Sequence, residues 1–192
     1  MKTERRPYRQ SARAQAAAAT RERILDVATE HFLQRYYDEV TLAKIAKEAG
    51  VSQQTVLNHF RSKEGLLEAA AERIDPERSR RANTDDPVEG VVGDYEPSGD
   101  ATIRMIALEE RVPALGPFLA RGRAGHRAWV EEAFAAHLPP PGAPDRERAV
   151  ALHVVATDIS TWKVLRRDMG LSRAATVDAM RTMVDALSTT KA

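Results

Sequence analysis

Apolar residues along this chain recur every three or four positions, which is the spacing of one face of an α-helix. No segment of useful length alternates between apolar and polar residues as a half-buried strand does. The pattern therefore predicts an all-α fold. It also predicts where the helices lie: about 21–36, 42–49, 53–60, 62–74, 103–108, 113–137, 145–169 and 172–188.

The segment 41–60 has the clearest pattern. In its first half, four apolar residues fall at i, i+3, i+4 and i+7 and define one buried stripe: Leu42, Ile45, Ala46 and Ala49. Thr41 and Ser52 precede the two short helices, where a side-chain oxygen can accept a hydrogen bond from an unpaired amide. Gly50 lies between the helices, where a residue without Cβ takes positive φ at little cost. The segment is therefore predicted to be a helix-turn-helix.

The second helix of this segment has a polar outer surface. Val56 and Phe60 are four residues apart and face inward, so the remaining side chains point outward: Gln53, Gln54, Thr55, Leu57, Asn58 and His59. Gln and Asn carry paired donors and acceptors that suit base edges in the major groove of DNA. On spacing alone a second interpretation stays open, because two short amphipathic helices joined by Gly also occur in helical proteins that never bind DNA.

Residues 21–67 resemble the DNA-binding domain of TetR-type transcriptional regulators. The matching residue types stand at the spacing of that family: Ile45-Ala46, Ala49-Gly50-Val51-Ser52, Thr55-Val56, His59-Phe60, Ser62-Lys63-Glu64 and Leu66-Leu67. The chain departs from the family at Leu57, where a phosphate-contacting Tyr is usual, and near Tyr36, where Gly is frequent. The resemblance implies a repressor whose larger C-terminal domain binds a small-molecule effector. It also implies a homodimer on a pseudo-palindromic operator.

Two kinds of DNA contact are predicted for residues 20–67. Base reading is assigned to Gln53, Gln54, Thr55 and Asn58. Phosphate positioning is assigned to Thr41, Ser52, His59 and Lys63, through their side chains or the helix N-termini that they begin. A cation is unfavourable at a helix start, so a phosphate partner would explain Lys63, and a solvated lysine is the alternative. Leu57 is expected to contact a thymine methyl group or a deoxyribose.

The charge distribution adds a third candidate contact. The chain of 192 residues has a net charge of +1. Twelve basic and eight acidic residues precede position 65, so that part carries +4 and the rest carries −3. The excess is greatest in residues 1–19, where five basic residues face only Glu4: Lys2, Arg5, Arg6, Arg9 and Arg13. This segment is predicted to be a flexible basic arm that reaches along a minor groove, with a solvated leader of no fixed partner as the alternative.

Residues 68–192 are expected to form the effector-binding and dimerisation domain. Polar stretches at 75–87 and 94–100 predict a linker and a turn. The candidate pocket residues are Met105, Leu108, Phe118, His126, Trp129, Phe134, His153, Thr157 and Trp162. An ordinary helical core explains each of them as well. Residues 150–159 are apolar nearly all round, and the last helix has a seam suited to a dimer: Val177, Met180, Val184 and Leu187.

Several classes of protein are excluded or disfavoured by composition and motif. The chain has no Cys, which excludes disulfides, thiolate catalysis and zinc fingers. No apolar run is long enough for a membrane span or a signal peptide, so a cytoplasmic protein is expected. His126, His137 and His153 could in principle serve an enzyme, but no metal-binding, phosphate-binding or nucleophile motif accompanies them. We therefore expect no catalytic residue, metal or cofactor. A helical enzyme and an architectural DNA-binding protein without an effector are the alternatives.

Overall fold

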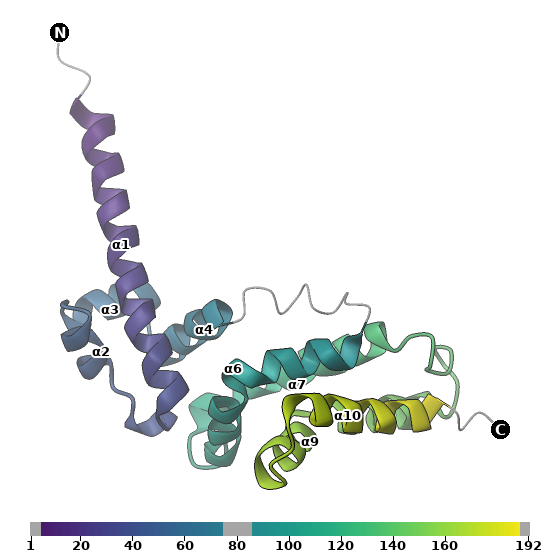
Figure 1. The fold of residues 1–192 in the computed structure, drawn as a ribbon. Helices are drawn as coiled ribbons and strands as arrows, with labels where there is room; N and C mark the ends of the chain where they lie inside the picture. The colour runs from purple at the N-terminus through teal and green to yellow at the C-terminus, as the bar shows by residue number, and fades with distance from the viewer. Residues whose placement is uncertain (1–4, 75–85, 189–192) are drawn as a thin grey trace. The chain divides into compact units, whose positions relative to one another are not determined.

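The structure is a computed structural model that describes residues 5–74 and 86–188 (Figure 1). The chain divides into two compact units, Met1–Ile74 and Asp75–Ala192. The described residues form helices and turns and contain no strand, as the spacing of apolar residues predicts. The first unit extends past Leu67, where we expected the DNA-binding domain to end, because the helix that begins at Lys63 continues to Ile74.

The first unit is a small helical domain built on one long helix. Its elements are α1 (Arg5–Gln34), η1 (Tyr37–Glu39), α2 (Leu42–Glu48), α3 (Gln53–Phe60) and α4 (Lys63–Ile74). The C-terminal half of α1 packs against α2, α3 and α4. Fully or almost fully buried apolar side chains from all four helices fill the space between them: Ile24, Ala28, Phe32, Ile45, Val56, Leu66 and Ala70. This core holds α2 and α3 as a helix-turn-helix.

Local hydrogen bonds start both helices of the pair, as predicted. The Thr41 hydroxyl oxygen accepts from the amide of Lys44 at 3.3 Å, and that of Ser52 accepts from the amide of Thr55 at 3.1 Å. Gly50 has φ of +66°, in the left-handed region that favours glycine. These three positions fix where α2 ends and α3 begins.

The first helix begins at Arg5, earlier than the predicted start at Arg21. Residues 5–19, which we expected to form an irregular basic arm, are helical, and residues 13–19 are exposed. The composition explains this correction, since Ala14 and the run Ala16 to Ala19 have the highest helix propensity of any residue type. The charge pattern alone had suggested an arm. Residues 1–4 lie outside the described part of the chain.

The second unit is a helical bundle around a larger core. Its elements are α6 (Pro87–Leu108), η2 (Pro113–Leu115), α7 (Gly116–Ala133), α8 (Arg146–Thr157), α9 (Ile159–Lys163), the π-helical turn η3 (Val164–Asp168) and α10 (Arg173–Ser188). In Figure 1, α10 lies beside α6, and these two helices are in contact. The core draws on α6, α7, α8, α9 and α10 and on Phe134, which directly follows α7: Val92, Tyr95, Val130, Phe134, Val150, Trp162 and Met180.

The predicted turn at 94–100 is wrong, because α6 runs through this segment with Pro97 inside it. Asp86 starts the helix by accepting from the amides of Val88 at 3.1 Å and Glu89 at 3.0 Å. The apolar face of α6 is buried on both sides of the proline, at Tyr95 and at Ala101. Burial of that face outweighs the hydrogen bond that proline cannot donate. Of the predicted linker 75–87, residues 75–85 lie outside the described residues.

The predicted helix 145–169 is also wrong, because it is broken at Asp158. Asp158 has extended backbone angles and its carboxylate accepts from the amide of Ser160 at 2.8 Å, which starts α9. Side chains donate hydrogen bonds to two carbonyl groups near this break. The Tyr95 hydroxyl donates to the Thr157 carbonyl at 3.0 Å, and the Thr161 hydroxyl donates to the Val155 carbonyl at 2.6 Å.

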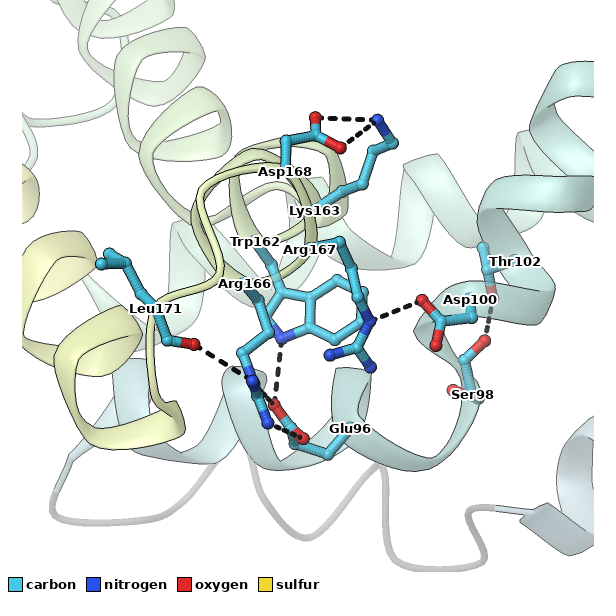
Figure 2. A network of polar contacts seen from close by, with 10 residues as sticks. All are labelled: Glu96, Ser98, Asp100, Thr102, Trp162, Lys163, Arg166, Arg167, Asp168 and Leu171. Atoms are coloured by element: carbon cyan, nitrogen blue, oxygen red, sulfur yellow. Dashed lines mark hydrogen bonds and ion pairs between the residues drawn. The ribbon is translucent and has the colours of Figure 1, made fainter.

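A polar network fastens α9 and η3 to α6 (Figure 2). The Trp162 indole N–H and Arg166 Nε both donate to the Glu96 carboxylate, at 3.3 and 2.9 Å. Arg167 Nε donates to Asp100 at 2.8 Å, and its guanidinium lies 4.6 Å from the centre of the Trp162 ring. The ring of Trp162 is fully buried against Gly99, where a Cβ atom would come within 2.5 Å of it. The network therefore depends on a glycine at that position.

The residues predicted to form the dimer seam lie inside this subunit. Val177, Met180 and Val184 are buried in the core of the second unit, and Leu187 packs against that core. The spacing of three and four positions is correct for one buried helix face, but α10 places that face against α6 and α8 of its own chain. An intermolecular seam through these residues is therefore corrected to an intramolecular one.

Candidate nucleic-acid interface

The outer surface of α3 carries the predicted base-reading residues. Gln53, Gln54 and Asn58 are exposed, and Thr55 is half-buried. Gln54 Nε2 donates to Asn58 Oδ1 at 3.0 Å, one helical turn away. This bond orients the two amides together and uses neither the carbonyl of Gln54 nor the amino group of Asn58. One acceptor and one donor therefore stand side by side, as recognition of a base edge requires.

The remaining predicted contacts near α3 differ in exposure. The Thr55 hydroxyl lies 2.8 Å from that of Ser52, so both belong to the cap of the helix. Thr41 is exposed at the start of α2, while Leu57 and His59 are half-buried. The His59 ring lies 6.1 Å from that of Phe60, which is part of the core. Leu57 and His59 thus join the polar face of α3 to its buried face.

The turn between α3 and α4 is tight, and a second glycine makes it possible. Arg61 ends α3 with φ of +67°, an unusual value for a residue with a side chain. The Ser62 hydroxyl oxygen accepts from the amide of Gly65 at 3.1 Å. A Cβ atom on Gly65 would overlap the carbonyl oxygen of Phe60, so only glycine fits there. The residue pattern that matches the family leaves position 65 open, so it did not show that a glycine is needed there.

Lys63 has partners inside the domain. Its ammonium group donates to the carbonyl oxygen of Tyr37 and lies 3.9 Å from the centre of the Tyr37 ring. Burial lowers the pKa of Lys63, although the nearby carboxylates of Glu64 and Asp38 oppose this. The position of a lysine at the start of α4 therefore has an explanation that needs no phosphate. Its predicted phosphate contact stays a prediction.

Tyr37 contacts the start of α4 beside the predicted DNA-contacting residues, and the sequence did not reveal this role. Its side chain is buried in the first unit, and its hydroxyl donates to the Glu64 carboxylate at 2.7 Å. Burial and the bond to Glu64 raise the pKa of Tyr37, and the same bond lowers the pKa of Glu64. Tyr37 thus connects η1 to the first turn of α4. The sequence had marked this place only as a departure from the family near Tyr36.

Two further contacts brace the helix-turn-helix against α1. His31 Nε2 lies 2.8 Å from the Glu48 carboxylate at the end of α2, and this bond lowers the pKa of Glu48. The Arg21 guanidinium lies 5.1 Å from the centre of the Phe60 ring at the end of α3. α1 therefore holds both ends of the surface that carries the predicted contacts.

In the second unit, five of the nine predicted pocket residues come together. They form what we call the His153 cluster, together with His137: His126, Trp129, Phe134, His153 and Thr157. The other four lie elsewhere in the unit. Met105 and Leu108 are buried toward the end of α6, Phe118 is half-buried in the first turn of α7, and Trp162 packs against Tyr95.

Within residues 5–74 and 86–188, no three His, Asp or Glu side chains are placed so that they could hold a metal ion. None of the helices in this described part is long and apolar enough to cross a membrane.

Comparisons with known proteins agree with this geometry. Residues 24–70 match the tetR family of bacterial regulatory proteins. The chain is 35% identical over 68 residues to the HTH-type transcriptional regulator AlkX of Mycobacterium tuberculosis, a segment that covers 35% of this chain and 30% of that protein. It is 35% identical over 77 residues to an HTH-type transcriptional repressor of the same organism, covering 40% of this chain and 41% of the repressor. The chain thus spans less than half the length of these relatives.

The fold extends the likeness beyond the matched segment. The crystal structure of a tetR-family transcriptional regulator from Streptomyces coelicolor superposes with a TM-score of 0.62 at 22% identity, covering 89% of this chain and 82% of that one. Both units therefore have the fold of that regulator. Residues 24–70, which contain the capped helix-turn-helix, therefore belong to the tetR family of bacterial regulatory proteins, and the chain shares the fold of a tetR-family regulator.

Proposed function

We propose that this protein is a sequence-specific DNA-binding repressor that a small-molecule ligand releases from a pseudo-palindromic operator. The observation that carries the proposal is the polar face of α3, where Gln53, Gln54 and Asn58 are exposed on a helix that Ser52 caps. A helix of this kind places side-chain amides at base edges in a major groove. Because DNA is the partner, we place the protein in the cytoplasm. The family is one of regulators, and we propose no catalytic activity.

The DNA contacts are divided by role. Gln53, Gln54, Thr55 and Asn58 read bases. Thr41, Ser52 and His59 position the sugar-phosphate backbone, and Leu57 contacts a thymine methyl group or a deoxyribose. The half-buried position of Leu57 supports an apolar contact, since a side chain at the edge of the groove can exclude water there. Lys63 contributes to phosphate binding only if its bond to Tyr37 opens.

The decisive experiment selects bound DNA from a random pool and then measures affinity for the selected site as a function of salt. Gln53→Ala should relax preference at one base position and cost about 1–3 kcal/mol there. Lys63→Ala should weaken all sequences alike and reduce the salt slope by roughly one unit if it contacts a phosphate. If the wild-type protein enriches no sequence, the proposal fails.

An architectural DNA-binding protein is the competing proposal. Such a protein would bind with weak base preference, and no small molecule would change its affinity. The paired amides of Gln54 and Asn58 favour base reading over this alternative, because contacts to phosphates alone do not need them. The salt slope and the enriched sequences together separate the two proposals.

The homodimer needs a different surface from the one that the sequence suggested. Leu152 and Val155 lie one turn apart on α8 and are 41% and 63% exposed, and Met183 on α10 is 36% exposed. Exposed alanines continue the stripes on both helices, at Ala151 and Ala186. We propose that these outer faces of α8 and α10 meet those of a second copy, since stable association requires apolar surface of this kind.

The effector site is proposed at the His153 cluster. Its residues lie on α7, on the turn after it and on α8, and they combine aromatic rings with polar groups, as ligand sites do. A ligand there would shift the protein between two conformers if its affinity for them differs. Titration of the protein on its selected DNA site with candidate ligands tests this part separately from DNA binding.

A further inference from the structure

The His153 cluster runs from the surface of the second unit into its core. His137 is exposed, His126 and Trp129 are half-buried, and Phe134 and His153 are buried. Successive rings are in contact: His126 and Trp129 have centres 5.3 Å apart, Trp129 and Phe134 5.6 Å, and Phe134 and His153 5.3 Å. The rings therefore form a continuous series of contacts from the half-buried Trp129 inward to His153.

One atom of this cluster lacks the hydrogen bond that its burial calls for. His153 is 2% exposed, and its Nδ1 atom lies 2.8 Å from the carbonyl oxygen of Ala149. A carbonyl only accepts, so Nδ1 carries the proton and Nε2 of the neutral ring is a bare acceptor. Nε2 is buried and has no hydrogen-bond partner among the described residues. Such an unsatisfied group is costly, and a donor that reached it would remove that cost.

Two hydrogen bonds of Thr157 lie beside this atom, one within α8 and one between α8 and α7. The Thr157 hydroxyl donates to the His153 carbonyl at 2.7 Å. Its proton is used there, so its oxygen accepts from His126 Nε2 at 3.2 Å. His126 Nε2 therefore carries the proton of its ring. These two bonds fix the polar groups beside His153 before any ligand arrives.

We propose that the His153 cluster binds an uncharged aromatic compound bearing a hydroxyl or N–H group, which donates to His153 Nε2 while its ring packs on Phe134 and Trp129. An ionised carboxylate or phosphate has no donor for a bare nitrogen, so anions are disfavoured. A purely apolar compound leaves the nitrogen unsatisfied. The inference rests on the proposed effector site and names the class of ligand that this site selects.

The test compares 4-ethylphenol with 4-ethyltoluene, in which a methyl group replaces the hydroxyl, by calorimetry on the full-length protein. His153→Phe keeps a ring but removes the acceptor. We expect this substitution to weaken 4-ethylphenol by about tenfold, the equivalent of one hydrogen bond, and to leave 4-ethyltoluene unchanged. Tyr36→Phe, at a 46% exposed position in the first unit and outside the cluster, is the control and should change neither affinity.

Nitrogen-15 NMR of the wild-type protein gives a second measurement that does not depend on a variant. The His153 Nε2 resonance should move upfield when 4-ethylphenol binds and should stay in place with 4-ethyltoluene. The proposal is overturned if neither compound binds or if His153→Phe weakens both compounds equally. It is also overturned if the Nε2 resonance does not move, the result expected when a buried water already donates to this nitrogen. DNA selection on the same protein is independent, so a failure here leaves the DNA-binding proposal standing. A protein that selects no DNA overturns that proposal instead.

Discussion

Tyr37 and Lys63 lie 26 positions apart in the sequence and contact each other at the start of α4. The Tyr37 ring lies under the Lys63 ammonium group, and its hydroxyl holds the carboxylate of Glu64. Together they fix the first turn of α4 against η1. The caps at Thr41 and Ser52 could be predicted because their partners are three residues away. The contacts of Tyr37 could not, because only the folded chain brings η1 to α4.

Tyr37→Phe should lower the free energy of unfolding by about 1 kcal/mol, since it removes one buried hydrogen bond and keeps the ring. The effect should depend on pH. The bond lowers the pKa of Glu64 in the folded state, so its contribution is present above the unfolded pKa of a glutamate. This stabilising contribution is lost as the pH falls through the pKa of Glu64 in the folded protein. Urea unfolding from pH 7 down to pH 3 should show the variant and the wild type converging in acid.

Tyr36→Phe is the control for this experiment. Tyr36 is 46% exposed, so loss of its hydroxyl should leave the stability unchanged at every pH. A constant difference between Tyr37→Phe and the wild type across the acid range would show that Glu64 is not the partner that matters.

At the scale of elements, the helical period located most helices, but it expected an interruption in α6 that is absent and missed the interruption after α8. α6 passes through Pro97 because its apolar face is buried on both sides of the proline. α8 ends at Thr157, and Tyr95 and Thr161 donate hydrogen bonds to carbonyl groups at this break. Both outcomes depend on packing against other helices, such as the hydrogen bond of Tyr95 to Thr157, 62 positions away, which a local pattern does not record.

Gly125→Ala in α7 should stabilise the protein by about 0.5–1 kcal/mol. Gly125 lies inside a helix without positive φ, and a Cβ atom added there meets nothing within 4 Å. The gain comes from the smaller conformational freedom of alanine in the unfolded chain. Urea unfolding of the full chain measures it. A decrease in stability would mean that α7 is not helical at this position.

Gly99→Ala in α6 is the counterpart with the opposite sign. The new Cβ atom would stand 2.5 Å from the ring of Trp162, which is fully buried and held by Glu96. Overpacking of this kind costs roughly 1–3 kcal/mol, more than the helix propensity that alanine adds. We expect a net loss of about 1–2 kcal/mol and a change in Trp fluorescence. An unchanged stability with unchanged fluorescence would contradict the packing of Trp162 on α6.

At the scale of the whole molecule, the sequence predicted that the C-terminal helices join two copies of the chain, but the face of the last helix that it assigned to this role packs within one subunit. The stripe from Val177 to Val184 is buried within one subunit. The apolar residues that remain exposed on α8 and α10 are Leu152, Val155 and Met183. Periodicity identifies an apolar face and cannot tell whether its partner belongs to the same chain or to another.

Val155→Glu should therefore convert the proposed dimer to a monomer, because a charged side chain would be buried where two copies of α8 meet. Sedimentation velocity should show the mass falling by half. Affinity for a palindromic site should fall steeply, while affinity for a single half-site should not change, since α3 is untouched. Ile106→Glu is the matched control, because Ile106 is 40% exposed on α6, away from the proposed interface. If Ile106→Glu dissociates the protein and Val155→Glu does not, the interface involves α6 and our assignment to α8 is wrong.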